Sequence, residues 1–204
     1  MNIIVCVKEI ADPEAPSEDF RLDTDRNVLV ASPKVLEVLN PFDEQAVEAA
    51  LQIKDKVGAK VTALSLGKGL DRVVTKKPVF MGADELILLE DDTFAGGDSW
   101  STAHALAAGI RKIGEYDLIL CGRQAADWNA GQTGSGIAEL LDLPCITVAR
   151  KIEITDGKAR VERVTANGYE TVEVTLPAVI TVSNEIGQFN QSLASFAKRR
   201  QRFK

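Results

Sequence analysis

Short apolar runs, each bounded by turn residues, recur along the chain. They are Ile3 to Val7, Val61 to Leu66, Leu86 to Leu89, Leu118 to Cys121, Cys145 to Ala149 and Ala178 to Val182. The runs are almost continuously apolar, which is typical of parallel strands that are buried on both faces. The pattern therefore predicts a buried sheet rather than a sheet with one face in water.

Helical periodicity lies between these runs. One helix is predicted to begin with Asn40 as its N-cap and Pro41 at its first position. Its apolar stripe consists of Ala46, Ala50, Ile53 and Val57, with Val47 and Leu51 beside it. A second amphipathic segment runs from Asp98 to Lys112, and Pro78 is expected to kink or end a helix before it. Strand and helix alternate, which predicts a doubly wound, mostly parallel α/β sheet.

Residues 151–176 depart from this rhythm. Apolar residues there largely alternate with polar ones, and Asp156-Gly157 and Asn167-Gly168 stand where hairpin turns belong. We expect an antiparallel hairpin excursion, and a shorter one over Arg21 to Val30. The chain is expected to form a single α/β domain over residues 1–185, followed at 186–204 by a separate segment and a basic C-terminal tail.

Composition narrows the function classes. The chain has 204 residues, 45% of them hydrophobic, which suits one full α/β domain. A net charge of −6 argues against a general role on nucleic acid or a membrane surface. No apolar run approaches the roughly 20 residues that span a bilayer, and the start of the chain does not resemble a signal peptide.

The cysteines and the single histidine point away from metal and triad chemistry. Cys6, Cys121 and Cys145 lie in apolar runs without a C-x-x-C pair, so we expect buried, reduced thiols in a reducing compartment. His104 is the only histidine, and we assign it a structural or surface role. No metal site and no acid, base or nucleophile is nominated.

The candidate chemistry lies in the stretch from Cys121 to Gly134. It joins an apolar strand to a helix predicted to start near Gly131, and it is rich in glycine, amide and hydroxyl side chains. Such a loop can hold a phosphate at a helix N-terminus, although it can also serve as a plain turn. Neither G-x-G-x-x-G nor a P-loop motif is present. Spacing alone predicts only a phosphate loop or a turn.

The order of several motifs along the chain is more specific than the spacing within this one loop. Gly122-x-Gln124-Ala125-x-Asp127 followed by Gln132-Thr133-Gly134 resembles the nucleotide loop of the electron transfer flavoprotein β subunit. Further matching segments follow the family's order: Val7-Lys8, Asn40-Pro41-Phe42-Asp43-Glu44, Met81-Gly82-Ala83-Asp84 and Leu176-Pro177-Ala178-Val179. The resemblance covers roughly residues 1–185 and implies a Rossmann-like domain that binds an adenine nucleotide.

The resemblance also implies a set of contacts at the carboxyl ends of the parallel strands. Cys6 and Val7 would offer backbone groups to the adenine, and Leu66 would close the adenine pocket. Asn40 would reach the ribose or adenine, with a simple helix cap as its alternative role. The residues that would surround the phosphates and ribose are Gly122, Arg123, Gln124, Asp127, Asn129, Gln132, Thr133 and Gly134.

A second segment bears on which nucleotide is bound. The stretch from Phe94 to Thr102, with Gly96 and Asp98, resembles that of family members that hold a complete FAD, as electron-bifurcating members do. Ser99 and Thr102 would hold its pyrophosphate. The alternative is a helix start with Asp98 as N-cap and AMP in place of FAD. We favour FAD over AMP.

The implied function is that of an electron transfer flavoprotein β subunit. It would pair with an FAD-bearing α subunit and pass electrons from a dehydrogenase or NADH to an acceptor, in the cytoplasm or a mitochondrial matrix. Leu193 aligns with the family's docking leucine, but Gln188-Phe189-Asn190 replaces the usual Pro-Arg-Tyr, and the chain ends at Lys204 without the longer arm.

Two other classes stay open. The Gly-Gly-Asp-Ser string at 96–99 is similar to the phosphate loop of ATP pyrophosphatases, but it falls after the third strand rather than the first. A non-redox, stress-protein-like nucleotide module would share the α/β architecture. The expected hairpins at 151–176 argue against that module.

Overall fold

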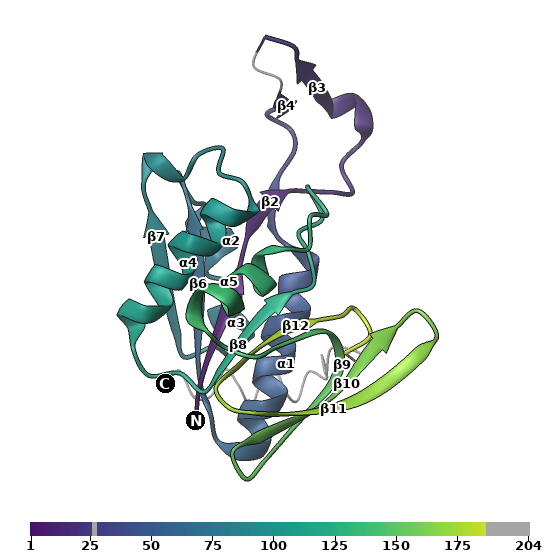
Figure 1. Cartoon of the computed structure of the whole chain (residues 1–204). Coiled ribbons are helices and arrows are strands. Elements are labelled where there is room, and N and C mark those ends of the chain that lie inside the picture. Colours follow the sequence, from purple (N-terminus) through teal and green to yellow (C-terminus); the bar gives the residue numbers. More distant parts are fainter. Residues whose placement is uncertain (26–27, 187–204) are drawn as a thin grey trace.

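A computed structural model describes residues 1–25 and 28–186. The main sheet has eight strands in the order β11-β10-β9-β12-β8-β1-β6-β7, and the six strands from β9 to β7 run parallel (Figure 1). Their bounds are β1 Asn2–Val7, β6 Lys60–Gly67, β7 Glu85–Glu90, β8 Leu118–Gly122, β9 Cys145–Thr155 and β12 Ala178–Val182. The predicted mostly parallel α/β sheet is confirmed, and the apolar runs are its strands.

Helices cover both faces of this sheet. The apolar side of α1 (Pro41–Val57) packs in one buried cluster with Ile3 and Val5. The alternate residues Ile4 and Cys6 pack in a second cluster with α4 (Ser99–Ile113) and α5 (Thr133–Leu141). Because the central strands β1, β8 and β12 are buried on both faces, their sequences are continuously apolar rather than alternating.

The antiparallel excursion is confirmed. β9 continues past Ala149 and pairs with β10 (Lys158–Thr165), which pairs with β11 (Gly168–Thr175). The first turn places Asp156 and Gly157 in the left-handed region, with φ of 49° and 73°. This conformation is the one that Asp-Gly and Asn-Gly turns favour.

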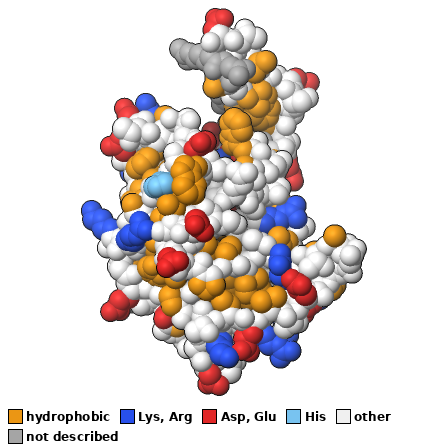
Figure 2. Space-filling view, viewed as in Figure 1, with side chains coloured by type: hydrophobic (Ala, Val, Ile, Leu, Met, Phe, Trp, Pro, Cys, Tyr) orange, Lys and Arg blue, Asp and Glu red, His pale blue; other side chains and the backbone are white. Residues whose placement is uncertain are grey.

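A second, smaller hairpin stands away from the sheet (Figure 1). β3 (Phe20–Asp23) pairs antiparallel with β4 (Val28–Ala31), as expected for this segment. A short ladder of β2 (Glu9–Ala11) and β5 (Glu37–Leu39) joins it to the body, and a 3₁₀ turn (Ser17–Asp19) precedes β3. Figure 2 shows apolar side chains gathered on the hairpin, where Leu22 and Leu29 are largely exposed.

Two details of the helix predictions need comment. Val57 does not belong to the buried stripe of α1: its exposed fraction is 46%, because it lies in the last turn, beyond the packed face. Pro78 does interrupt the helix, as expected. α2 (Arg72–Thr75) ends before it, and Pro78 lies in the first turn of α3 (Lys77–Met81), where a missing N–H costs no hydrogen bond.

Candidate functional site

The predicted nucleotide residues lie at one edge of the sheet, at the carboxyl ends of the parallel strands. β1 ends at Val7 and β8 at Gly122. β6, the next strand of this sheet along the chain, lies on one side of β1, and β8 lies on the other side, so the strand order reverses at β1. Open α/β sheets bind their ligands outside such a switch in strand order. The N-terminus of α1 also reaches this edge, since the Asn40 N–H donates to the Lys8 carbonyl over 2.8 Å.

Asn40 is built into the candidate site through its side chain. Its amide nitrogen donates to the Gln124 carbonyl over 2.9 Å, and its amide oxygen accepts from the Ala126 N–H over 3.1 Å. The side chain forms no cap hydrogen bond with its own helix. Asn40 is the N-cap residue of α1, as the alternative role states, and both polar atoms of its side-chain amide also engage the 122–132 loop.

Asp43, which we did not nominate from sequence, lies behind this loop. Its carboxylate accepts from the Lys8 N–H over 2.8 Å and from the Gly122 N–H over 3.1 Å. Burial raises the pKa of Asp43 to about 7, although hydrogen bonds from Asn40, Lys8 and Gly122 act in the opposite direction. An acidic residue in the first turn of a predicted helix is common, and this spacing gave no sign that it would face two strands.

The loop is closed by its own contacts. The Gln124 side-chain nitrogen donates to the Asn129 side chain over 2.7 Å, and the Asn129 N–H donates to the Ala125 carbonyl. Lys8 forms an ion pair with Asp127 at 2.6 Å, with exposed side-chain fractions of 43% and 26%. The Arg123 guanidinium lies 5.0 Å from the centre of the Phe42 ring, and its buried Nε has no hydrogen-bond partner among the residues that the structure describes.

Two glycines of the predicted site have packing roles. A Cβ atom on Gly122 would lie 2.7 Å from the backbone carbon of Phe42 and 2.9 Å from the nitrogen of Asp43. A Cβ on Gly134 would lie 2.6 Å from a methyl carbon of Thr181. These glycines let α1 and α5 approach the sheet closely. Their contact with a phosphate stays a prediction.

The segment predicted to separate FAD from AMP lies beside this loop. The short 3₁₀ turn Asp92–Phe94 follows β7, and the Asp91 N–H donates to the carbonyl of Gly67 at the end of β6. The starts of α4 and α5 adjoin, since a Cβ on Gly136 would lie 3.0 Å from that of Ala103. The two predicted phosphate segments are therefore neighbours.

Asp98 caps α4, as the alternative interpretation of this segment states. Its carboxylate accepts from the Ser101 N–H over 2.8 Å and from the Ser101 hydroxyl over 2.7 Å. These bonds lower the pKa of Asp98. The hydroxyls of Ser99 and Thr102 form no hydrogen bond with any residue that the structure describes. Capping by Asp98 thus leaves them available to a ligand.

The predictions for the cysteines were partly right. Cys6 and Cys121 are buried free thiols, as expected. Cys145 is exposed, because it is the first residue of β9 and lies just outside the buried part of the sheet, which begins at Ile146. His104 is exposed and its ring meets that of Trp100 edge-on at 4.8 Å. Within residues 1–25 and 28–186, no group of three or more His, Cys, Asp or Glu side chains is arranged to hold a metal ion. Leu193 lies outside the described residues.

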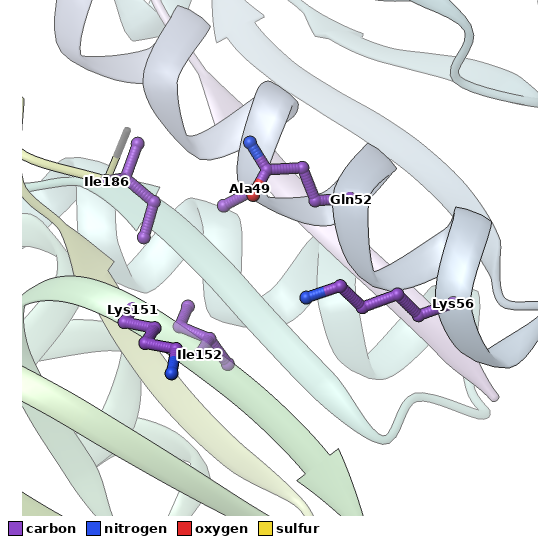
Figure 3. Close-up of a pocket in the computed structure, with 6 residues that line it drawn as sticks. All are labelled: Ala49, Gln52, Lys56, Lys151, Ile152 and Ile186. Atoms are coloured by element: carbon purple, nitrogen blue, oxygen red, sulfur yellow. The ribbon is translucent and has the colours of Figure 1, made fainter. Parts of the chain in front are cut away.

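A small pocket lies away from this edge, between the C-terminal half of α1 and β9 (Figure 3). Its lining residues are Ala49, Gln52, Lys56, Lys151, Ile152 and Ile186. None of the predicted nucleotide residues contributes to it, so we do not connect it with the candidate site.

None of the described helices has the length and apolar character that crossing a membrane requires.

The fold and the site define an α/β protein with a candidate nucleotide site at the carboxyl edge of its parallel strands. The model of the electron transfer flavoprotein domain family matches residues 28–201. Two relatives, both called electron transfer flavoprotein subunit beta, are 41% identical over 186 residues (Thermoanaerobacterium thermosaccharolyticum) and 38% identical over 186 residues (Clostridium acetobutylicum). These alignments cover 91% of this chain and 69% and 70% of the relatives.

A further relative is the caffeyl-CoA reductase-Etf complex subunit CarD of Acetobacterium woodii. It is 40% identical over 187 residues, which cover 91% of this chain and 70% of that protein. The chain belongs to the electron transfer flavoprotein β-subunit family. Its relatives support a role in electron transfer, and the resemblance drawn from the motifs is confirmed.

Proposed function

We propose that this chain binds an adenine nucleotide at the edge formed by β1, β8 and the start of α1, and that it acts with an α subunit in electron transfer. The observation that carries the proposal is the 122–132 loop held by Asn40, next to the N-terminus of α5. Gln132, the N-cap of α5, makes no side-chain cap hydrogen bond, so the first N–H groups of this helix can serve an anion.

The residues present fit such a ligand. The buried Arg123 Nε is a donor without a partner in residues 1–25 and 28–186, and a phosphate or ribose oxygen would satisfy it. Thr133 starts α5 and would donate its hydroxyl beside the helix N–H groups. The ends of β1 and β6, at Val7 and Leu66, would flank the adenine. The chain's own contribution is to bind, orient and shield the ligand.

We infer that the ligand is FAD, with AMP as the alternative. The support is that α4, whose first turn carries Ser99 and Thr102, packs its Ala103 against Gly136 near the start of α5, and that Asp98 does not use these two hydroxyls. A bound flavin would supply the electron-accepting chemistry. A dehydrogenase or NADH would be the electron donor, and the cytoplasm, or a mitochondrial matrix, the compartment.

The test is to co-purify the chain with its α subunit, release the ligands by heat, and record their masses and visible spectra. We expect two flavins per pair. The double change Ser99→Ala with Thr102→Val should remove one of them, whereas Ser101→Ala, which removes a hydroxyl that Asp98 already engages, should keep both. One FAD and one AMP per pair would contradict the FAD proposal, and a pair without any adenine nucleotide in this subunit would contradict the binding proposal.

A further inference from the structure

The Asp43 carboxylate is surrounded by hydrogen-bond donors. The Lys8 N–H donates to one oxygen and the Gly122 N–H to the other. The neighbouring Asn40 side chain also favours the ionised form, since it lowers the pKa of the carboxyl group. An ionised carboxylate accepts from both N–H groups. Protonation turns one of the oxygens into a hydroxyl, which is a weaker acceptor than a carboxylate oxygen, so at least one of these bonds would weaken.

These donors are the parts that shape the 122–132 loop. Gly122 begins the loop, and Asn40 holds its backbone at Gln124 and Ala126. Lys8 pairs with Asp127 inside the loop. A change in the protonation of Asp43 would therefore affect the residues that fix the loop at Gly122, at Gln124 and Ala126, and at Asp127.

We propose that Asp43 is a positioning residue that makes nucleotide binding at this edge depend on pH: its ionised form holds the loop in the binding geometry, and its protonation releases the loop. The proposal rests on the nucleotide site proposed above. It assigns to Asp43 no contact with the ligand.

The pKa of Asp43, which burial raises to about 7, puts this change near neutral pH. Lys8 and Cys121 interact electrostatically with Asp43, and Glu44, Arg123 and Asp127 are the charged residues next to it along α1 and the loop. Lys8 and Asp127 form an ion pair, and Glu44 is paired with Lys77. A hydrogen bond with Cys6 and burial raise the pKa of the Cys121 thiol well above its ordinary value, so this thiol stays neutral near pH 7.

The experiment measures the Kd of the full chain for FAD by calorimetry at about pH 6 and about pH 8. FAD is the probe because its pyrophosphate does not titrate in this range, whereas a phosphate monoester such as AMP has a second pKa of about 6. We expect FAD to bind about tenfold more weakly at the lower pH, since one proton is then taken up by the free protein. Asp43→Asn should bind more weakly at the higher pH and show no such change between the two.

Control variants separate this effect from others. His104→Gln changes an exposed residue of α4, outside the set of contacts around Asp43, and should keep the tenfold change. Asp127→Asn, which breaks the ion pair with Lys8, should weaken binding by the same factor at both pH values. An unchanged tenfold effect in Asp43→Asn, or a wild-type affinity independent of pH, would overturn the inference and leave the nucleotide site standing.

A second measurement needs neither the variant nor the ligand. In nitrogen-15 NMR spectra of the free wild-type chain, the amide signals of Lys8 and Gly122 should shift with one common midpoint near pH 7. Signals that stay fixed across neutral pH would overturn the inference even if Asp43→Asn does not fold. Absence of FAD and AMP binding at every pH would overturn the proposed function and this inference together.

Discussion

The starts of α1 and α4 use similar residues in opposite ways. Each has a polar N-cap position and an aspartate in reach of backbone N–H groups. At α4, Asp98 is exposed and bonds to the first turn of its own helix. At α1, Asn40 and Asp43 are buried, and their side chains bond to β8, its loop and Lys8. The first arrangement stabilises a helix end, whereas the second joins three separate segments at the candidate site.

The two aspartates should respond oppositely to pH, and this is the largest effect we expect. The pKa of Asp43 is raised from 3.8 to about 7 by burial, so the folded state binds this proton more tightly than the unfolded state. Its contribution to stability is complete below the unfolded pKa and is lost as pH rises through about 7. The loss is about 4 kcal/mol at most, as an order of magnitude.

Denaturant unfolding from about pH 4 to about pH 8 measures this difference. Asp43→Asn should flatten the decline in the free energy of unfolding. The hydrogen bonds to Asp98 lower its pKa, so its contribution is present above the unfolded pKa and is lost only as pH falls through the folded value. Asp98→Asn should leave the neutral range unchanged. A decline that survives in Asp43→Asn would mean that another group causes it.

Glycine substitutions test the same difference between the starts of α1 and α4. Gly122→Ala would push a methyl group into the backbone of Phe42 and Asp43, and we expect a loss of about 3 kcal/mol, the upper end of overpacking costs. Gly97→Ala, before α4, would meet only the Ser101 hydroxyl at 3.0 Å. It should cost less than about 1 kcal/mol. Thermal unfolding of both variants checks the ranking, and equal losses would remove the distinction between the two helix starts.

Asn40→Ala should separate binding from stability. It removes two hydrogen bonds to the loop and should destabilise the chain by about 2 kcal/mol. Asp98→Ala removes a helix cap at an exposed position and should cost less than Asn40→Ala. Titration with AMP distinguishes them further. Affinity should fall about tenfold or more in Asn40→Ala and stay within about twofold in Asp98→Ala. Equal affinities would show that Asn40 is only structural.

The ion pair between Lys8 and Asp127 should have the smallest effect on stability. Its side chains are partly exposed, so Asp127→Asn should change the free energy of unfolding by less than about 1 kcal/mol. The change should shrink further at high salt. Unfolding at two salt concentrations tests this, and a loss well above 1 kcal/mol would mean that Asp127 also supports the loop in other ways.

The sequence predicted the strands because burial on both faces leaves a continuous apolar run, as in Leu118 to Cys121. It also predicted the Asp-Gly and Asn-Gly turns, whose backbone conformation is local. The role of Asp43 was missed because it depends on contacts with Lys8 and Gly122, which are far away in sequence. Cys145 was placed inside for a similar reason: an apolar run does not reveal which of its ends leaves the core.

Amide hydrogen exchange with FAD and with AMP tests the central claim most directly, because it locates the ligand on the chain. Compared with the free protein, we predict slower exchange with either nucleotide in residues 6–8 and 122–134. With FAD alone, it should also slow at 96–102, where Ser99 and Thr102 begin α4. Protection that leaves 122–134 unchanged, or that appears only elsewhere on the chain, would contradict the assignment of this edge as the nucleotide site.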